Sequence, residues 1–390
     1  MYLGKQVIQV QSTLMRGGTS KGIVLRTVNL PSQPKERDRI ILRLFGSPDQ
    51  NQVDGLGGGT SLTSKLALIG PPTHPGAHLD YTFGQVSLEK EEIDYTPTCG
   101  NMATAVGLFA AEEGYVELTE PITWVNIYNT NINKTIVAEI PVVDGHIQYE
   151  GDFTIDGVPG ASSKIMLNFL DSGGTFTGKT LPTGNPVDII VLEDGREFPV
   201  SVIDCANIVI FVEAASLGIV GTELKNEIDT NNSLLKTLEQ IRVEVGYRLG
   251  VIKDKALATP ATNAIPKIAI ISPPSEYRTT TNRLLNADAV DIVARYFAMG
   301  VLHRAFAVSG SIALATAAKI PGTLANKIVP STVGELRIGH PSGTIFVDAD
   351  VSKDGDKWLV SRAAVGRTAR RLMDGYAYVK TESLKSNSLS

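Results

Sequence analysis

The chain has 390 residues, of which 43% are hydrophobic and 20% are charged, and its formal net charge is −5. This is the composition of an ordinary globular protein. The mild negative charge argues against a general nucleic-acid or membrane-surface binder, because such proteins present a basic face. A single hydrophobic core is unusual at this length, so two domains are expected.

The first ten residues alternate in polarity and lead into a polar stretch, which differs from a signal peptide. No apolar run approaches the roughly 20 residues that span a bilayer. With Cys99 and Cys205 as its two cysteines, the chain excludes a disulfide framework or a cysteine zinc site as its organising principle. We expect a cytoplasmic protein with both thiols reduced.

Runs of β-branched residues bounded by turn residues predict strands along most of the chain. They lie at 6–10, 22–26, 122–128, 135–143, 187–192, 208–212, 267–271, 334–338 and 344–350. Apolar residues at three- and four-residue spacing predict helices at 35–45, 101–113, 223–250, 288–297 and 311–318. Many strands around a few helices predict an α+β fold built from sheets, each with a helix in its concavity.

A weak internal repeat favours two similar domains. The segment 99–105, Cys-Gly-Asn-Met-Ala-Thr-Ala, resembles 309–315, Ser-Gly-Ser-Ile-Ala-Leu-Ala. The segment 14–25 likewise resembles 181–192, and each has a turn before a strand. The offsets of the two matches differ by about forty residues, which a helix-rich insertion near 221–253 would explain.

Cys99 is the first candidate catalytic residue. It immediately precedes a predicted helix, where unpaired N–H groups and the positive end of the helix dipole favour a thiolate. The dipole contributes about 1 kcal/mol, so a nearby cation would be needed for full ionisation at neutral pH. The alternative is a buried structural cysteine, although Gly100 and the other flanking small residues favour close approach of a ligand.

Lys65 ends a glycine-rich segment, 54–65, whose backbone could present N–H donors to an anion. It is not a Walker loop, because no Gly-Lys-Ser/Thr ends it. The alternative is a simple turn with a solvated lysine.

A third cluster, 15–22, places Arg16 beside two glycines and two hydroxyls, which could hold a carboxylate or form a polar hairpin.

Arg278 and His340 are weaker candidates for anion binding. His74 and His78 have loose metal-ligand spacing, but Pro75 and Gly76 between them predict a turn and no third ligand is evident, so we predict no metal. Cys205 lies in an apolar strand and is predicted to pack in the core.

Together these clusters resemble the PrpF family of methylaconitate and methylitaconate isomerase relatives, which share the diaminopimelate epimerase-like fold. The matching segments are 15–22, 54–59 with 64–65, 94–102, 181–185, 203–204, 221–223, 320–323 and 339–343, in order along the chain.

The resemblance implies two similar domains, each a β-sheet wrapped around a central α-helix, with the active site in the interdomain cleft. We expect an N-terminal domain at 1–182, a C-terminal domain at 183–375 that contains the helical insertion, and a tail at 376–390.

The resemblance also matches Cys99 and Lys65 to the family's proton-transfer pair. The diaminopimelate epimerases carry a second cysteine where this chain has Ser309, a departure that agrees with the isomerase branch.

The expected reaction is cofactor-independent isomerisation of a small unsaturated di- or tricarboxylate by allylic proton transfer, which yields either a cis–trans or a double-bond-shifted isomer. Aconitate or methylaconitate is the leading substrate, with methylitaconate or 4-oxalomesaconate as alternatives; a non-catalytic carboxylate-binding accessory protein is the alternative of another class. Cys99 is favoured as base over Lys65. The expected partner is the small-molecule polycarboxylate, with no nucleic acid or membrane, and a homodimer is compatible with the sequence. The predicted substrate-binding residues are Arg16, Gly17, Gly18, Thr19, Ser20, Ser61, Ser64, Gly100, Asn101, Met102, Arg278, Ser309, Gly310, Ser311 and His340.

Overall fold

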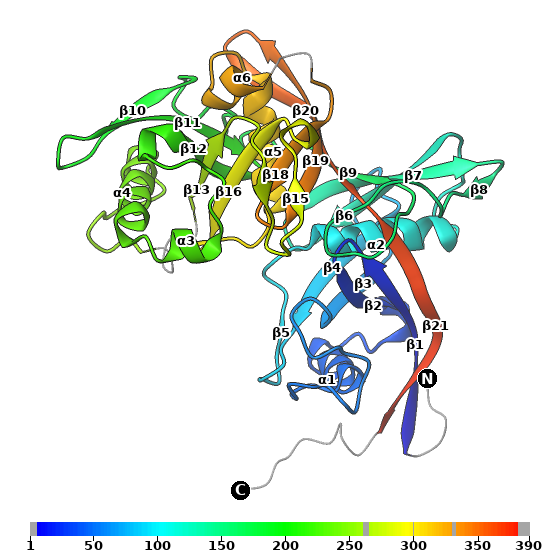
Figure 1. Ribbon diagram of the computed structural model, residues 1–390. Coiled ribbons are helices and arrows are strands. Elements are labelled where there is room, and N and C mark those ends of the chain that lie inside the picture. Colours follow the sequence, from blue (N-terminus) through cyan, green and yellow to red (C-terminus); the bar gives the residue numbers. More distant parts are fainter. Residues whose placement is uncertain (1–5, 260–264, 299, 330–332, 381–390) are drawn as a thin grey trace, which may run out of the picture. The chain divides into compact units, whose positions relative to one another are not determined.

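The chain forms two compact units in a computed structural model that describes residues 6–259, 265–298, 300–329 and 333–380 (Figure 1). The first unit comprises Met1–Asn168 together with Arg367–Ser390, and the second comprises Phe169–Gly366. The second unit is therefore an uninterrupted stretch of chain inserted into the first.

This division differs from the predicted boundaries at 182/183 and 375/376. The chain returns to the first unit at Arg367, because β21 (Ala369–Lys380) pairs antiparallel with β1 (Val7–Gly17) along its whole length. Residues 376–380, predicted to begin a tail, belong to this strand. The expected location of the active site between the domains stays a prediction.

The first unit is built from strands of one mixed sheet, with α1 and α2 packed against it. Besides β1 and β21, its elements are β2 (Ser20–Arg26), α1 (Pro34–Phe45), β3 (Lys65–Gly70), β4 (Leu79–Val86), β5 (Ile93–Asp94), α2 (Gly100–Glu112), β6 (Ile122–Asn129), β7 (Lys134–Val143), β8 (His146–Ile147) and β9 (Ile165–Phe169).

The second unit has a mixed sheet around α5, with further helices outside it. Its elements are β10 (Asp188–Val191), β11 (Glu197–Cys205), β12 (Asn207–Glu213), α3 (Lys225–Asp229), α4 (Asn232–Arg248), β13 (Lys267–Ser272), β14 (Tyr277–Arg278), β15 (Leu284–Leu285), β16 (Ile292–Ala298), β17 (Val301–Leu302), α5 (Val308–Lys319), α6 (Leu324–Ile328), β18 (Leu336–His340), β19 (Gly343–Asp354) and β20 (Lys357–Arg367).

The two units repeat one order of strand pairing. In the first, β1–β2 is antiparallel, β2–β3 parallel, β3–β4 antiparallel, β4–β6 parallel and β6–β7 antiparallel. In the second, β11–β12, β12–β13, β13–β16, β16–β18 and β18–β19 follow the same alternation. The predicted α+β fold with two similar domains is confirmed.

The same alternation tests the two repeat matches separately. Helices α2 and α5 occupy equivalent places, each between the fourth and fifth strand of the series, so the match of 99–105 with 309–315 is correct. The match of 14–25 with 181–192 is wrong. The counterpart of the β1–β2 hairpin is β11–β12, whereas 181–192 consists of a loop and the short β10.

The central helices are buried on every side. All residues of α2 from Met102 to Ala111 are buried, and those of α5 from Gly310 to Ala318 are buried as well. A helix that is apolar all round is a core element rather than a surface one. Gly107 allows α2 to pack closely against β7, because a Cβ at this position would lie 2.2 Å from the Cβ of Ala138.

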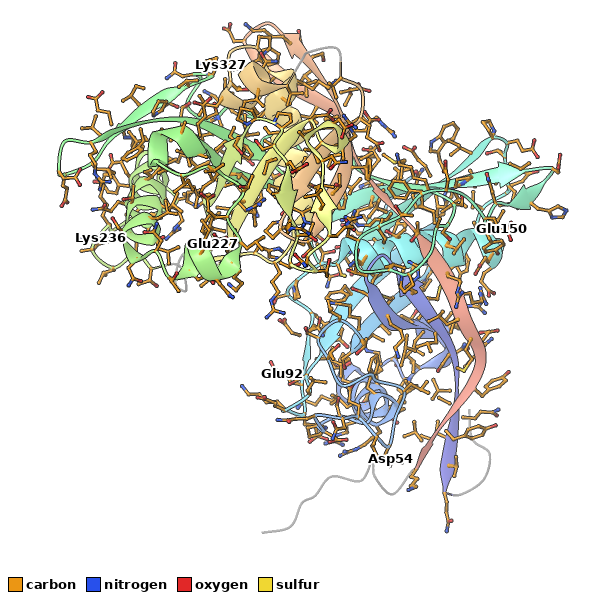
Figure 2. The ribbon with its side chains drawn as sticks, in the orientation of Figure 1. Asp54, Glu92, Glu150, Glu227, Lys236 and Lys327 are labelled. Atoms are coloured by element: carbon orange, nitrogen blue, oxygen red, sulfur yellow. The ribbon has the colours of Figure 1, made fainter. Side chains whose placement is uncertain are left out.

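One predicted helix, 288–297, is instead strand β16. The run from Ile292 to Phe297 is β-branched and aromatic, and it pairs with β13 on one side and β18 on the other. Arg295 within it is fully buried, and its guanidinium donates to the carbonyl oxygens of Glu223 and Thr222. By contrast, Glu92, Glu150 and Lys236 are exposed (Figure 2).

The predicted helix at 223–250 is divided into α3 and α4. The break falls at Thr230 and Asn231, where the Asn231 side chain accepts from the N–H of Leu234 and begins a new helix. Across the described ranges, no helix is both long and apolar enough to cross a membrane.

The carboxyl end of α2 carries two acidic residues, Glu112 and Glu113, where the helix dipole disfavours negative charge. Arg371 on β21 donates to both carboxylates, with Nε–Oε2 and Nη2–Oε1 distances of 2.7 Å each, and Arg26 pairs with Glu113. Both guanidinium carbons lie 5.5 Å from the ring centroid of Phe109. This cluster joins α2 to β2 and β21.

We expect Arg371→Met to lower the free energy of unfolding by about 2 kcal/mol, because it leaves two mostly buried carboxylates with one cation between them. Urea denaturation measures the change. Arg248→Met, which removes an exposed pair with Glu244, is the matched control and should cost less than about 0.5 kcal/mol. Equal losses in the two variants would contradict this account of the helix end.

Candidate functional site in the first unit

Cys99 is the N-cap residue of α2 and is half-buried. Its side chain makes no capping hydrogen bond, so it leaves the first N–H groups of α2 free to meet an anion. The hydroxyl of Tyr81 on β4 donates to the Cys99 carbonyl oxygen at 3.3 Å. Burial, with the charge of Cys99 as a second cause, raises the pKa of Tyr81, so this phenol stays protonated as a donor.

The turn between β1 and β2 lies directly against the first turn of α2. A Cβ on Gly17 would stand 2.0 Å from the carbonyl oxygen of Asn101, and one on Gly18 would stand 2.1 Å from its side-chain oxygen. Asn101 Nδ2 donates to the hydroxyls of Thr19 and Ser20 at 3.1 Å each. The predicted residues Gly17 to Ser20 and Gly100 to Met102 are thus brought together.

Arg367 supplies the cation that the sequence argument required near Cys99. Burial lowers the pKa of Arg367 to about 10, and a negative charge on the nearby Cys99 would oppose this shift. The Arg367 side chain also lies close to Gly18, since a Cβ there would be 3.4 Å from its Cδ. Sequence reasoning missed Arg367, because it lies far along the chain; the basic run at 367–371 is the signal that could have found it.

Lys65 is the first residue of β3, opposite Gly22 on β2 and Gln85 on β4. Its Nζ donates to Gln85 Oε1 at 2.9 Å and lies 5.1 Å from the ring centroid of Phe83. Gln85 Nε2 in turn donates to the carbonyl oxygens of Ser64 and Ser61, at 3.0 and 3.3 Å. The carboxamide is therefore held by its nitrogen with its oxygen toward Lys65.

The predicted substrate-binding residues Ser64 and Ser61 both contact Gln85 through their carbonyl oxygens. The Ser64 hydroxyl is fully buried and accepts from Gln52 Nε2, whose side chain also binds Ser47 and the N–H of Gly59. Ser61 is exposed. Their carbonyl oxygens anchor Gln85, so in this structure the two serines support Lys65 through the backbone.

Arg16 lies on the opposite face of the hairpin from α2. Side chains alternate along a strand, and both neighbours of Arg16 face the helix: Met15 is fully buried, and a Cβ on Gly17 would touch Ala105. The Arg16 Nη1 atom donates to the carbonyl oxygens of Gly18 and Thr368 and to the Thr368 hydroxyl, at 2.9–3.1 Å. The structure therefore does not bring its guanidinium to Cys99.

The predicted residues of the second unit fall into two groups. Ser309, Gly310 and Ser311 form the first turn of α5, whose N-cap is Ala307, so Ser309 lies one residue inside the helix rather than at its cap. Asn207 Nδ2 donates to Ser309 Oγ at 3.5 Å, which repeats the contact between hairpin turn and helix seen at Asn101. The Ser311 hydroxyl is buried and donates to the Val308 carbonyl.

Arg278 and His340 lie in neighbouring segments. The Tyr277 hydroxyl donates to the His340 carbonyl oxygen at 2.7 Å, and Arg278 follows Tyr277 on β14. Arg278 is exposed and its Nη1 donates to the Asn282 carbonyl, whereas His340 is buried and its Nδ1 accepts from the N–H of Ser342. Their role in substrate binding stays a prediction.

Cys205 is a core residue. It is fully buried, its thiol donates to Ser172 Oγ at 3.4 Å, and it accepts from Thr316 Oγ1 at 3.3 Å. Burial raises the pKa of Cys205 to about 11.

His78 Nδ1 accepts a hydrogen bond from the N–H of Asn126. Within the described ranges, no group of three His, Cys, Asp or Glu residues could hold a metal ion.

A family model described as "PrpF protein" matches residues 7–380. The chain belongs to the PrpF family.

The chain is similar to relatives in this family over nearly their whole length. The chain is 44% identical over 380 residues to the 3-methylitaconate isomerase of Eubacterium barkeri, with 97% of this chain and 99% of that protein covered. It is 38% identical over 388 residues to the 2-methyl-aconitate isomerase of Shewanella oneidensis, with 95% and 97% covered. The crystal structure of methylitaconate-delta-isomerase matches with a TM-score of 0.91 at 42% identity, covering 99% of both chains. This PrpF protein is an isomerase.

We expect Gly17→Ala to reduce the isomerase activity at least 100-fold, because the added methyl group must displace the hairpin turn or the start of α2. Initial rates of isomerisation measure the effect. Gly334→Ala, at a position with open space around the Cβ, is the matched control and should retain activity. A Gly17→Ala enzyme of normal activity would show that the contact with Asn101 is dispensable.

The Cys205 thiol should make unfolding sensitive to alkaline pH. The pKa of the Cys205 thiol is raised in the folded protein, so folding favours the neutral thiol. The free energy of unfolding therefore includes the full contribution of this thiol below about pH 9, and this contribution is lost as the pH rises to about 11. We expect the free energy of unfolding to fall more steeply over this window in the parent protein than in Cys205→Ser, as urea denaturation would show. Parallel curves would refute the assignment.

Proposed function

We propose that this chain shifts the double bond of a small branched unsaturated di- or tricarboxylate by allylic proton transfer, with Cys99 as base and Lys65 as acid, and without a cofactor. The observation that carries the proposal is the position of Cys99 at the uncapped start of α2 beside Arg367. A thiolate there meets both a cation and unpaired N–H groups.

The proton transfers balance without any change of oxidation state. Cys99 thiolate removes a proton from the carbon allylic to the double bond, so a C–H bond breaks and an S–H bond forms. The electron pair is delocalised into the conjugated carboxylate as a dienolate, which N–H groups and cations stabilise. Lys65 ammonium then protonates the far carbon, and proton exchange between thiol and amine restores both groups.

The surroundings of Lys65 support its role as the acid. Gln85 Oε1 can only accept a hydrogen bond, and the face of the Phe83 ring attracts a cation. Both contacts are of the kind that a cationic donor makes, and a bound polycarboxylate would be a third such partner. We therefore assign the acid to Lys65 and the base to Cys99, as the sequence alone favoured.

For the substrate we propose 3-methylitaconate first and methylaconitate or aconitate second. The relative named for 3-methylitaconate is 44% identical to this chain, and the relative named for 2-methyl-aconitate is 38% identical. This order reverses the expectation from sequence. The two acids differ by one carboxylate, so the cations and N–H donors that the pocket offers to a third carboxylate decide between them.

The test is incubation with each acid in deuterated water containing EDTA, followed by NMR of the alkene and methyl signals. We expect a shifted double bond with solvent deuterium in the product, and a loss of at least 1,000-fold in both Cys99→Ser and Lys65→Met. Cys205→Ser is the matched thiol control and should remain active. No exchange with any of these acids or with 4-oxalomesaconate would overturn the proposal and favour a carboxylate-binding protein.

Gln85 should act as a positioning residue for Lys65. We expect Gln85→Met, which keeps the length of the side chain but removes both hydrogen-bonding groups, to lower kcat about 10- to 100-fold with a smaller change in KM. Gln85→Glu keeps an acceptor for Lys65 and should recover part of kcat. Gln148→Met, at an exposed glutamine, is the control. Equal losses in the Met and Glu variants would mean that Gln85 acts only on folding.

A further inference from the structure

Three cations stand in one row across three adjacent strands of the first unit. Arg16 on β1 is directly opposite Lys21 on β2 and directly opposite Arg370 on β21. Directly opposed residues share a face of the sheet with their Cβ atoms about 5 Å apart, and like charges so placed repel one another. This face is the one turned away from α2, as the position of Arg16 shows.

The row has no acidic partner among the described residues. The three acceptors of Arg16 are two carbonyl oxygens and a hydroxyl, all uncharged, and Lys21 and Arg370 form no ion pair. The adjacent Arg371, whose side chain reaches α2, binds Glu112 and Glu113. Burial, with the charge of Arg370 as a second cause, lowers the pKa of Arg16, which supports the close approach of the two guanidinium groups.

A pocket of about 450 Å³ opens over this row. Its wall on the other side is the loop 157–162, which approaches Thr19 closely, since a Cβ on Gly157 would be 3.4 Å from the Thr19 methyl carbon. The lining residues are Arg16, Gly18, Thr19, Ser20, Lys21, Thr63, Gly157, Val158, Pro159, Gly160, Ala161, Ser162, Thr368, Arg370 and Leu372. The lining therefore combines three cations with several hydroxyl groups and contains no carboxylate.

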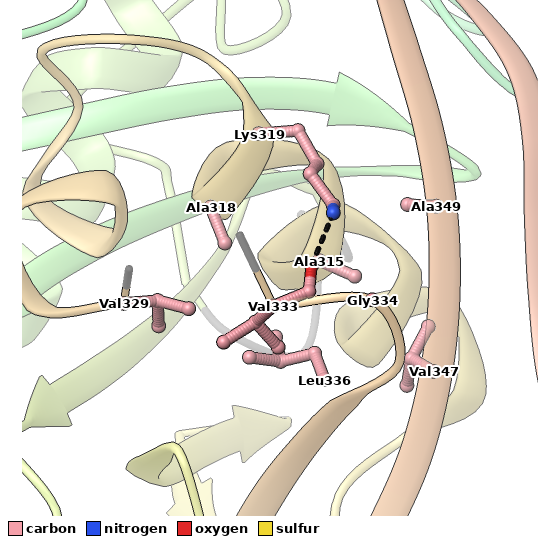
Figure 3. A pocket seen from close by; sticks show the side chains of 9 residues that line it. All are labelled: Ala315, Ala318, Lys319, Val329, Val333, Gly334, Leu336, Val347 and Ala349. Carbon is pink, nitrogen blue, oxygen red and sulfur yellow. Dashed lines mark hydrogen bonds between the residues drawn. The ribbon is translucent and has the colours of Figure 1, made fainter. Parts of the chain in front are cut away.

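A cavity in the second unit shows the contrast. It lies at the carboxyl end of α5 and is lined mainly by alanine, valine and leucine side chains, with Lys319 Nζ donating to the Val333 carbonyl oxygen (Figure 3). Its volume of about 10 Å³ has room for no more than a water molecule. The pocket over the cationic row is large enough for a small organic anion.

We propose that the pocket over Lys21, Arg16 and Arg370 is a second, non-catalytic binding site for a di- or tricarboxylate, separate from Cys99. Three cations spaced along a line match carboxylates distributed along a carbon chain better than the single centre of a phosphate. The identification of the ligand as a carboxylate rests on the proposed function. The negative charge of the ligand and the location of the site rest on the row of cations and the pocket over it. A ligand there contacts Thr19 and Ser20, whose hydroxyls bind Asn101 on the other side.

Isothermal titration calorimetry with tricarballylate, a saturated tricarboxylate, tests the proposal. We expect two equivalents to bind to the parent protein at low salt and one to Lys21→Met/Arg370→Met. Raising the salt should weaken binding at the pocket, because the cations are partly exposed. The matched control is Lys236→Met/Lys327→Met, which removes the same charge from exposed positions of the second unit and should still bind two equivalents (Figure 2).

Other outcomes would overturn the proposal. Two equivalents bound to Lys21→Met/Arg370→Met with unchanged affinity would place the second ligand elsewhere. A single equivalent bound to the parent protein and lost in this variant would make the row part of the substrate site. No binding to the parent protein would leave the row a solvated surface. Because calorimetry reads binding and not turnover, failure of the proposed isomerisation is detected separately by the exchange experiment.

Thermal unfolding gives an independent readout. Without an anion, Arg370→Met should unfold at a higher temperature than the parent protein, because removing one member of the row relieves repulsion. Adding tricarballylate should raise the unfolding temperature of the parent protein more than that of the variant. A lower unfolding temperature of the variant without ligand, and an equal gain with ligand, would contradict the proposal.

Discussion

Asn101 occupies the space that side chains at Gly17 and Gly18 would fill, and through this contact the start of α2 is held against the turn between β1 and β2. The rest of the candidate site depends on it. The turn brings Thr19 and Ser20 to Asn101, and its Gly18 N–H donates to Thr368, which fixes the place of the neighbouring Arg367. Cys99 therefore acquires a cationic neighbour from the far end of the chain because two glycines lack a Cβ.

The duplicated pairing order shows how two similar units acquire different chemistry. In both units a hairpin turn meets the first turn of a buried helix, through Asn101 in the first and through Asn207 in the second. The helix of the first unit begins after a cysteine, whereas α5 begins after Ala307 and places Ser309 inside its first turn. The scaffold is thus retained in both units, and the thiol stands at the helix start of the first unit.

Much of this could be predicted from local sequence. Gly-rich segments around Arg16, Lys65 and Cys99 indicated the candidate site of the first unit, and the alanine-rich pattern after Cys99 predicted a helix. What failed required long-range pairing. Residues 288–297 satisfied a helical spacing, yet two neighbouring strands bind them as β16. The outward direction of Arg16 follows from strand alternation and register, which the short motif does not reveal. Arg367 and Gln85 lie outside every motif and become neighbours of Cys99 and Lys65 only through the fold.

The return of the chain to β1 has a consequence for biosynthesis. The second unit is continuous from Phe169 to Gly366 and can form as soon as its own residues have left the ribosome. The first unit is still incomplete at that stage, because one edge of β1 pairs with β21 and the surroundings of Cys99 include Arg367, and both follow the second unit along the chain. A nascent or prematurely terminated chain thus holds Cys99 without Arg367 beside it, so the pair on which the proposed function rests forms only after Arg367 has been synthesised.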